Sequence, residues 1–264
     1  MMERVGSGAA SRSMRAILQS CAVWLAFSAI AVGQQTIVNV PSDALTPKGQ
    51  VFLMHETQLS WGSKTPDYNT TNFFAYGLSE QTELAITLYN VDEFGSDAMA
   101  LGLGFKTVKE LSAEWFEDLE PKWTYGLMAP ISLAEQDKAV GYFSYTHLTF
   151  AIPDTELRLL GGVAAGSKNL FEEDAISALL GVEFPLTEHL AFTGEWFSGT
   201  HGLSGLIPGI TYHHDRLILV AGLKIPNSFD PDKYGLVLEC GWFFGPSHKS
   251  DVESAVEFPH YGIR

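Results

Sequence analysis

Cysteine and basic residues are both scarce in this chain. Its 264 residues include two cysteines, Cys21 and Cys240, and Cys21 lies in a segment that we expect to be removed. One remaining thiol excludes an intramolecular disulfide, and no Cys/His cluster has metal-site spacing, so we expect no metal and no cofactor. The 16 Lys and Arg residues are outnumbered by 31 Asp and Glu. This balance argues against a nucleic-acid partner, which requires a basic patch.

Long apolar runs are also lacking, apart from one at the N-terminus. Residues 16–32 are almost wholly apolar, and Arg4, Arg12 and Arg15 precede them. With small residues at 31–33, this pattern predicts a signal peptide cleaved after Gly33. The alternative is a membrane anchor, but the run is at the short limit for spanning a bilayer. Cleavage would remove three arginines and one glutamate and take the net charge from −15 to −17.

The rest of the chain consists of short segments with alternating apolar residues, separated by Gly, Pro, Asn and Asp. Period-two alternation of this kind is typical of β-strands. We expect twelve strands, at 50–61, 71–79, 83–91, 97–106, 122–133, 139–151, 155–165, 175–185, 188–198, 204–213, 216–225 and 233–244. The predicted organisation is a signal peptide at 1–33, an N-terminal arm at 34–49, the strands at 50–244 and a C-terminal tail at 245–264.

Two faces can be distinguished in the clearest strands. In 216–225, Leu217, Leu219 and Leu223 alternate with a second set that includes Gly222 and Lys224. One wall of the sheet is therefore continuously apolar, and the other carries small or charged residues together with some apolar ones. This is the pattern of a transmembrane β-barrel, with lipid outside and a polar lumen inside. A soluble β-sandwich would also alternate, with its apolar face in a core.

Aromatic residues and loop lengths favour the barrel. Aromatic residues gather at strand ends, as interfacial girdles require; they are Phe73, Phe74, Trp123, Tyr125, Trp196, Tyr212, Tyr234, Trp242 and Phe244. Short and long connections also alternate, as they do between periplasmic turns and external loops. We therefore predict an all-β, antiparallel, up-and-down barrel of about 12 strands in the bacterial outer membrane, in contact with its lipid and lipopolysaccharide.

The segment 107–121 departs from this alternation, because it is long where a short turn is expected. Val108, Leu111 and Trp115 have helical spacing, and Pro121 ends the run. A short amphipathic helix at the rim is predicted, and a missed strand is the alternative.

Two stretches resemble known outer-membrane proteins. The alternating residues Leu236, Leu238, Cys240, Trp242 and Phe244 resemble the C-terminal strand signature that is read by the outer-membrane assembly machinery, although 20 residues follow Phe244 here. The stretches 38–42 and 195–201, with 208–210, are similar to a group of uncharacterised bacterial outer-membrane β-barrel proteins. The resemblance implies an outer-membrane location and a porin-like or transporter-like role, and it carries no catalytic or binding residue.

The sequence offers only weak support for catalytic or metal-binding residues. Ser144 and His147 are three residues apart on a strand, which places their side chains on opposite faces; Ser198 and His201 share this defect unless the chain turns at Gly199. His213 and His214 beside Asp215 could bind a metal, but adjacent strand residues diverge, so turn residues are the preferred interpretation. We expect no enzymatic activity.

Charges on the second face are the more informative set. We expect Lys106, Arg158, Glu183, Glu195, Lys224 and Glu239 to point into the lumen. They either brace a narrow barrel through salt bridges, with Glu239 and Lys224 as one cross-strand pair, or form a constriction that selects ions. The acidic run 172–174 in a predicted external loop is either a solvated loop or a site for divalent cations that bridge to lipopolysaccharide.

These patterns predict passive passage of small solutes or ions across the outer membrane. Two alternatives remain: a non-conducting envelope barrel that acts through its external loops in adhesion or as a scaffold, and a soluble periplasmic β-sandwich that binds a ligand.

Overall fold

The computed structural model describes residues 39–61, 67–90, 99–112, 117–133, 140–155, 157–168, 175–228 and 234–245. The predicted signal peptide, the start of the predicted arm, almost all of the C-terminal tail and the acidic run 172–174 lie outside these residues. Within the described part of the chain, no helix is long and apolar enough to cross a membrane.

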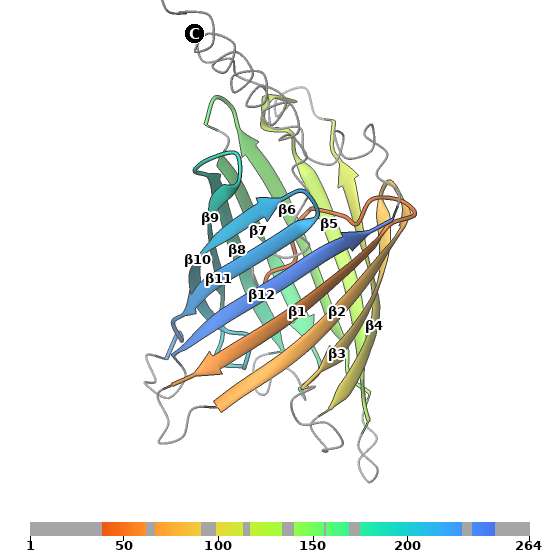
Figure 1. Ribbon diagram of the computed structural model, residues 1–264, viewed down its shortest axis with the longest axis vertical. Coiled ribbons are helices and arrows are strands. Elements are labelled where there is room, and N and C mark those ends of the chain that lie inside the picture. Colours follow the sequence, from red (N-terminus) through yellow and green to blue (C-terminus); the bar gives the residue numbers. More distant parts are fainter. Residues whose placement is uncertain are drawn as a thin grey trace, which may run out of the picture.

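Twelve antiparallel strands form one closed barrel in which each strand pairs with its neighbours in sequence (Figure 1). The strands are β1 (Val51–Ser60), β2 (Asp67–Ser79), β3 (Thr82–Tyr89), β4 (Ala100–Glu110), β5 (Lys122–Ser132), β6 (Phe143–Ile152), β7 (Leu157–Gly166), β8 (Ile176–Pro185), β9 (Leu190–Phe197), β10 (Gly205–His214), β11 (Leu217–Lys224) and β12 (Gly235–Phe244). Closure is made by β1 and β12, which pair from Val51 with Phe244 to Ser60 with Gly235. The predicted barrel and its strand number are confirmed, and the soluble β-sandwich is wrong.

The outer wall of the barrel is apolar. Leu219 on β11 is 39% exposed, while its neighbours Ile218 and Val220 are buried inside. Equivalent exposed apolar residues occur around the ring, among them Leu53, Leu103 and Trp242. Closure leaves no strand edge with unpaired backbone groups, which is the condition for a sheet to cross a bilayer. The outer wall therefore faces lipid.

Aromatic side chains mark the rim that carries the short turns. Trp123 and Tyr125 lie in contact on β5, and the Lys109 ammonium lies 6.0 Å from the Trp123 ring. Tyr212 stacks with His214 at the same rim. An amphipathic cluster of this kind suits the boundary between lipid and water. Phe73, which we had placed in the girdle, instead packs inside against Phe52.

The inner wall of β10, β11, β12, β1 and β2 is itself largely apolar. Phe52 and Phe243 have ring centroids 4.5 Å apart, and the buried cluster around them comprises Met54, Ala75, Ile207, Ile218, Val220 and Val237. These side chains fill part of the lumen, as expected for a barrel of this size.

The predicted amphipathic helix at 107–121 is wrong for the described part of that segment. Residues 107–110 continue β4, where Val108 pairs with Thr124. The chain then forms a single 3₁₀ turn at Glu117–Leu119. Alternation in Thr107, Val108 and Lys109 satisfies the strand period as well as the helical one, and pairing with β5 decides between them.

Replacing Leu219 with arginine should lower the free energy of unfolding by up to about 4 kcal/mol, because the charge would enter the lipid-facing wall two residues inside the end of β11. Unfolding by urea in lipid vesicles measures this change. Leu186→Arg is the matched control, because Leu186 is exposed in the short turn that follows β8, at the rim of the barrel, where the cost falls to about 0–1 kcal/mol. Equal costs at both positions would contradict the assignment of the lipid face.

Candidate functional site in the barrel lumen

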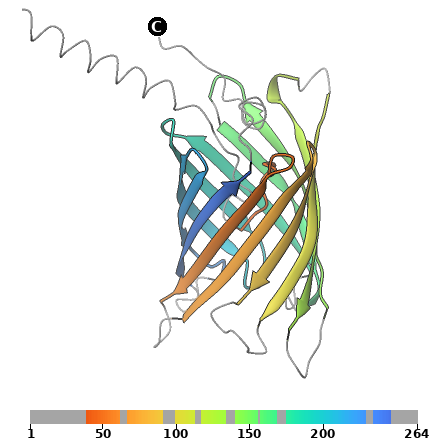
Figure 2. The ribbon, with the colours of Figure 1, turned by 45° about the vertical axis from the view of Figure 1, so that its right-hand side comes forward.

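An extended N-terminal segment, residues 39–50, lies inside the ring of strands (Figures 1 and 2). We call it the arm. It contains no helix and no strand, yet Val40 and Thr46 are completely buried and Asp43 is 7% exposed. Burial of an irregular segment requires that its backbone polar groups find partners. Glu195, Glu83 and Gly77 on the inner wall supply partners for several of these groups, and the Asp43 side chain adds ion pairs.

The first contact is Glu195 on β9, which holds the start of the arm. Its carboxylate accepts hydrogen bonds from the backbone N–H of Asn39 at 2.8 Å and of Val40 at 2.7 Å. The Gln58 amide on β1 donates to the Asn39 side chain at 3.1 Å. Glu195 and Gln58 both lie two residues from the end of their strands, at the rim with the long loops. The arm therefore begins in that half of the lumen.

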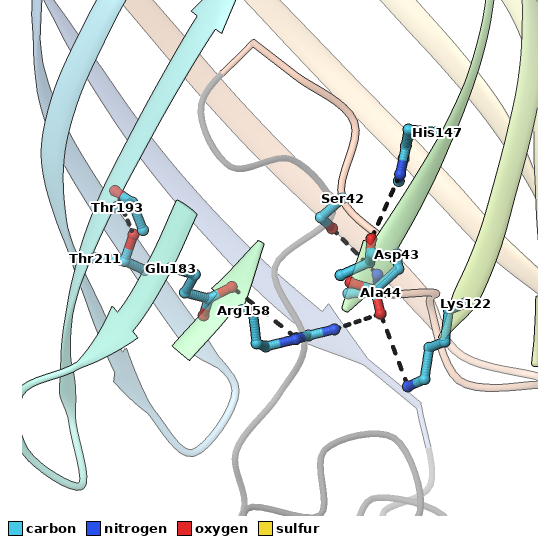
Figure 3. Close-up of polar contacts among 10 residues, drawn as sticks. Ser42, Asp43, Ala44, Lys122, His147, Arg158, Glu183, Thr193 and Thr211 are labelled. Carbon is cyan, nitrogen blue, oxygen red and sulfur yellow. Dashed lines mark hydrogen bonds and ion pairs between the residues drawn. The ribbon is translucent and has the colours of Figure 1, made fainter. Parts of the chain in front are cut away.

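The second contact is an ion-pair cluster around Asp43 (Figure 3). The Asp43 carboxylate pairs with Arg158 on β7 and lies 3.7 Å from the Lys122 ammonium on β5. Arg158 also lies 4.0 Å from Glu183, its cross-strand neighbour on β8. Lys122 is the first residue of β5 and Arg158 the second residue of β7, both at the short-turn rim. The arm therefore runs along the lumen from one half to the other.

Two opposed effects act on the Asp43 carboxyl. Its burial raises the pKa, but the attraction of Arg158 and Lys122 outweighs burial and holds the pKa below the ordinary value. The carboxylate is therefore charged at neutral pH, and its ion pairs contribute to arm docking until the pH falls through that lowered pKa.

The third contact is Glu83 on β3. One carboxylate oxygen accepts a hydrogen bond from the Thr46 backbone N–H at 2.7 Å. The other lies 3.1 Å from the ammonium of Lys106, the cross-strand neighbour on β4. Both side chains are at most 4% exposed, so the pair is enclosed by the wall and the arm.

The arm ends against Gly77 on β2. Gly49 donates to the Gly77 carbonyl at 2.8 Å, and Gly77 donates to the Gln50 carbonyl at 3.1 Å. A Cβ atom at Gly77 would lie 2.2 Å from the Pro47 carbonyl oxygen. Only glycine permits this close approach of the two backbones.

All six charges that we expected in the lumen lie on the inner side of the wall, and the structure divides them into two groups. Lys106, Arg158, Glu183 and Glu195 belong to the three contacts with the arm. Lys224 donates to the Gln58 side chain at 3.4 Å, and Glu239 faces Glu56 across the β1–β12 ladder. The expected Glu239–Lys224 cross-strand pair is wrong, because Glu239 pairs in register with Val220 and Lys224 with Gly235.

Several charges that matter here were not among those expected from the sequence, namely Asp43, Glu56, Glu83 and Lys122. Glu56 and Glu83 could have been found by extending the alternation of Phe52 and Met54 along β1 and that of Ala85 and Thr87 along β3. Asp43 carries no such signal, because it lies in a segment without periodicity.

Of the two predicted serine–histidine pairs, Ser144 and His147 lie on opposite faces as expected, whereas the contacts of His201 differ from those expected. His147 points into the lumen, whereas Ser144 donates to the Ala165 carbonyl within the sheet. The chain turns at Gly199, which has a φ of 100°. This turn places His201 Nε2 2.8 Å from the Ser177 hydroxyl and 3.0 Å from the backbone carbonyl oxygen of Ser198, not at the Ser198 hydroxyl. His214 lies 3.7 Å from Asp215, and within the described ranges no three His, Cys, Asp or Glu side chains are placed to hold a metal ion.

No protein family and no curated protein matches the sequence. Solved structures with a similar barrel include the KdgM porin in complex with disordered oligogalacturonate, at 8% identity and a TM-score of 0.46, covering 75% of this chain and 99% of that one. Outer membrane protein Omp33 of Acinetobacter baumannii aligns at 10% identity and a TM-score of 0.42, covering 75% of this chain and 100% of that one. Outer membrane phospholipase A of Escherichia coli aligns at 9% identity and a TM-score of 0.41, covering 76% and 94%.

Likenesses at such low identity concern the barrel fold alone, and no functional residue is carried over from them. The localisation follows from the molecule itself. A closed sheet with an apolar outer wall and aromatic side chains at its rim is stable only in a bilayer, and barrels of this kind occur in outer membranes. The chain is a bacterial outer-membrane β-barrel protein.

Proposed function

We propose that this barrel passes small ions or solutes across the outer membrane and that the arm closes it at rest. The observation that carries the proposal is the nature of the wall beneath the arm. It presents Glu83, Lys106, Arg158, Glu183 and Glu195, and these charged groups would line a wet passage if the arm left.

The attachment of the arm is suited to release. It consists mainly of ion pairs and hydrogen bonds to a segment without regular structure. One apolar contact is added by Val40, which joins a buried cluster with Leu160, Leu179 and Phe197, and the arm continues directly into β1 at Val51. A permanent filling would be more stable with apolar contacts, because replacing buried ion pairs by apolar residues is often neutral or stabilising. Apolar packing of that kind is extensive around Phe52 and Phe243, whereas within the arm it is concentrated at Val40.

Release of the arm would favour cations. Glu195 would lose its two N–H donors, while Glu56 and Glu239 face each other at the middle of the β1–β12 ladder. Three carboxylates from β1, β9 and β12 would then face the lumen, and rings of acidic side chains select cations in channels.

Replacing Asp43 with asparagine should convert a mostly closed barrel into a conducting one. The change removes the charge that attracts Arg158 and Lys122, while Arg158 keeps Glu183 as a neighbour. Single-channel current in planar bilayers measures the open fraction, and the reversal potential under a salt gradient measures cation preference. Adding Glu239→Gln to the Asp43→Asn barrel should reduce that preference.

Lys48→Gln is the matched control, because it breaks an arm ion pair with Glu80 in which both side chains are more than 60% exposed. An exposed pair contributes about 0–1 kcal/mol, so this variant should stay closed. If Asp43→Asn and Glu195→Gln both remain silent in a folded barrel, passage is excluded and the alternative of a non-conducting barrel acting through its external loops stands.

A further inference from the structure

Polar side chains interrupt the apolar outer wall where β1 pairs with β2, and His55, Thr57 and Asn72 are among them. His55 and Thr57 alternate with the inward-facing residues Met54, Glu56 and Gln58, so both point outward. Asn72 on β2 is the direct cross-strand neighbour of His55. The strands β12, β1 and β2 lie side by side at the front of Figure 1. A hydrogen-bonding group on a lipid-facing wall is costly unless it is paired or used.

These side chains form one continuous chain of hydrogen bonds. His55 Nδ1 lies 2.9 Å from the Asn72 side-chain oxygen, and His55 Nε2 lies 3.1 Å from the Thr57 hydroxyl. An amide oxygen only accepts hydrogen bonds, so Nδ1 carries the proton and donates it. Nε2 therefore has a free electron pair and accepts from the Thr57 hydroxyl. A hydroxyl, a histidine base and a third group that orients the base constitute the arrangement of nucleophilic acyl-transfer sites.

A second hydroxyl–histidine pair in the same barrel provides an internal comparison. His201 Nε2 lies 2.8 Å from the Ser177 hydroxyl but also 3.0 Å from the Ser198 carbonyl oxygen. A carbonyl only accepts, so this Nε2 is the protonated nitrogen and cannot take a proton from serine. Ser177 and His201 are also buried, at 1% and 2% exposure. The tautomer and the exposure both single out the outer-wall group.

The position of the group suits a lipid substrate. Thr57 lies three residues before the end of β1 at the long-loop rim, which places it about 7–8 Å inside that rim for a strand tilted by roughly 40°. The ester linkages of membrane lipids occupy this depth, between head groups and acyl chains. Exposed apolar side chains flank the group, including Leu53 and Leu238, and they can contact an acyl chain.

We propose that Thr57, His55 and Asn72 form a catalytic site that hydrolyses carboxylic esters of outer-membrane lipids. The Thr57 oxygen attacks the ester carbonyl carbon, and its proton moves to His55 Nε2. The ester C–O bond breaks, and the leaving alkoxide takes that proton and departs as an alcohol. Water then attacks the acyl-threonine and gives one proton to His55, which returns it to the Thr57 oxygen as the free fatty acid leaves. Asn72 holds the imidazole in the tautomer that makes Nε2 the base.

Two features conceal this group in the sequence. The serine–histidine pairs with a recognisable pattern are three residues apart, whereas His55 and Thr57 are two apart and therefore share a face. The third member comes from another strand, and only the β1–β2 register places Asn72 opposite His55.

The test measures release of fatty acid by the purified full chain from two separate substrates. One is phospholipid in mixed detergent micelles, and the other is purified lipopolysaccharide, whose acyl esters offer the same chemistry from a different source. Release from either substrate supports the site and identifies the lipid. Thr57→Val, which preserves shape but removes the hydroxyl, should lower kcat by about 100-fold or more. Thr57→Ser should retain activity, whereas His55→Gln should lose it.

Two controls separate chemistry from folding. Ser144→Ala removes an outward hydroxyl that has no histidine beside it and should leave the rate unchanged. Cys240→Ser alters the other cross-strand neighbour of His55 and should also leave it unchanged. Every variant should keep the shift in gel mobility between unheated and boiled samples. A folded wild-type chain that releases no fatty acid from either substrate overturns the proposal, as does full activity in Thr57→Val or loss of activity in Cys240→Ser. Conductance is independent of these variants, because the group lies outside the lumen.

Discussion

Replacing Lys106 with methionine is expected to lower the free energy of unfolding by about 3–5 kcal/mol, because it leaves the Glu83 carboxylate buried without its cation. The two charged groups lie 3.1 Å apart with side chains at most 4% exposed, so water cannot replace the lost partner. The Thr46 N–H remains as a hydrogen-bond donor to Glu83, but it carries no full charge. Urea unfolding in detergent micelles, followed by tryptophan fluorescence, measures the change.

The double variant Glu83→Gln/Lys106→Met is the control for this prediction. It removes both charges, and the glutamine oxygen can still accept from Thr46. Its stability should lie well above that of Lys106→Met and close to that of the wild type. A cost below about 1 kcal/mol for Lys106→Met alone would mean that Glu83 reaches solvent, which would contradict enclosure by the arm.

Replacing Gly77 with alanine is expected to displace the arm and open the barrel without any change of charge. The added Cβ atom would lie 2.2 Å from the Pro47 carbonyl oxygen and 2.4 Å from that of Thr46. Backbone atoms cannot rotate away as a side chain can, so the arm must move off β2. We expect single-channel current in planar bilayers where the wild type is mostly silent.

Gly161→Ala on β7 is the matched control, because its Cβ would meet only the Leu180 side chain, at 3.8 Å. Both variants should keep the gel shift on boiling, which reports an intact barrel. If Gly77→Ala folds and remains silent, displacement of the arm does not open a passage and arm gating fails. A current equally large in Gly161→Ala would point to general loosening of the wall instead.

Much of the fold could be predicted because the alternation of neighbouring residues along a strand identifies its two faces. Alternation in β11 and β12 is a property of neighbouring residues, so the apolar outer wall and the inward Lys224 and Glu239 follow without knowledge of the rest of the chain. Errors arose where two periods agree over a few residues, as at 107–110, where only pairing with β5 decides for a strand.

Partnerships within the site could not be predicted in the same way. Alternation indicates that Glu239 and Lys224 face inward. The register of the strand pairs, however, places Glu56 rather than Lys224 opposite Glu239. Register depends on loop lengths and on the stagger needed to close the ring, and both are properties of the whole barrel.

The sequence by itself therefore determined the class of the molecule, the approximate number of strands and the two faces of the most regular strands, such as β11 and β12. Only the tertiary structure decided that the arm lies in the lumen, since its first hydrogen bond joins Asn39 to Glu195 across 156 residues. It likewise decided that Asn72 meets His55 on the outer wall. The physical reason is the same in both cases. Local backbone geometry sets the face of the sheet to which a side chain points, whereas closure of the barrel sets which residues of different strands come into contact.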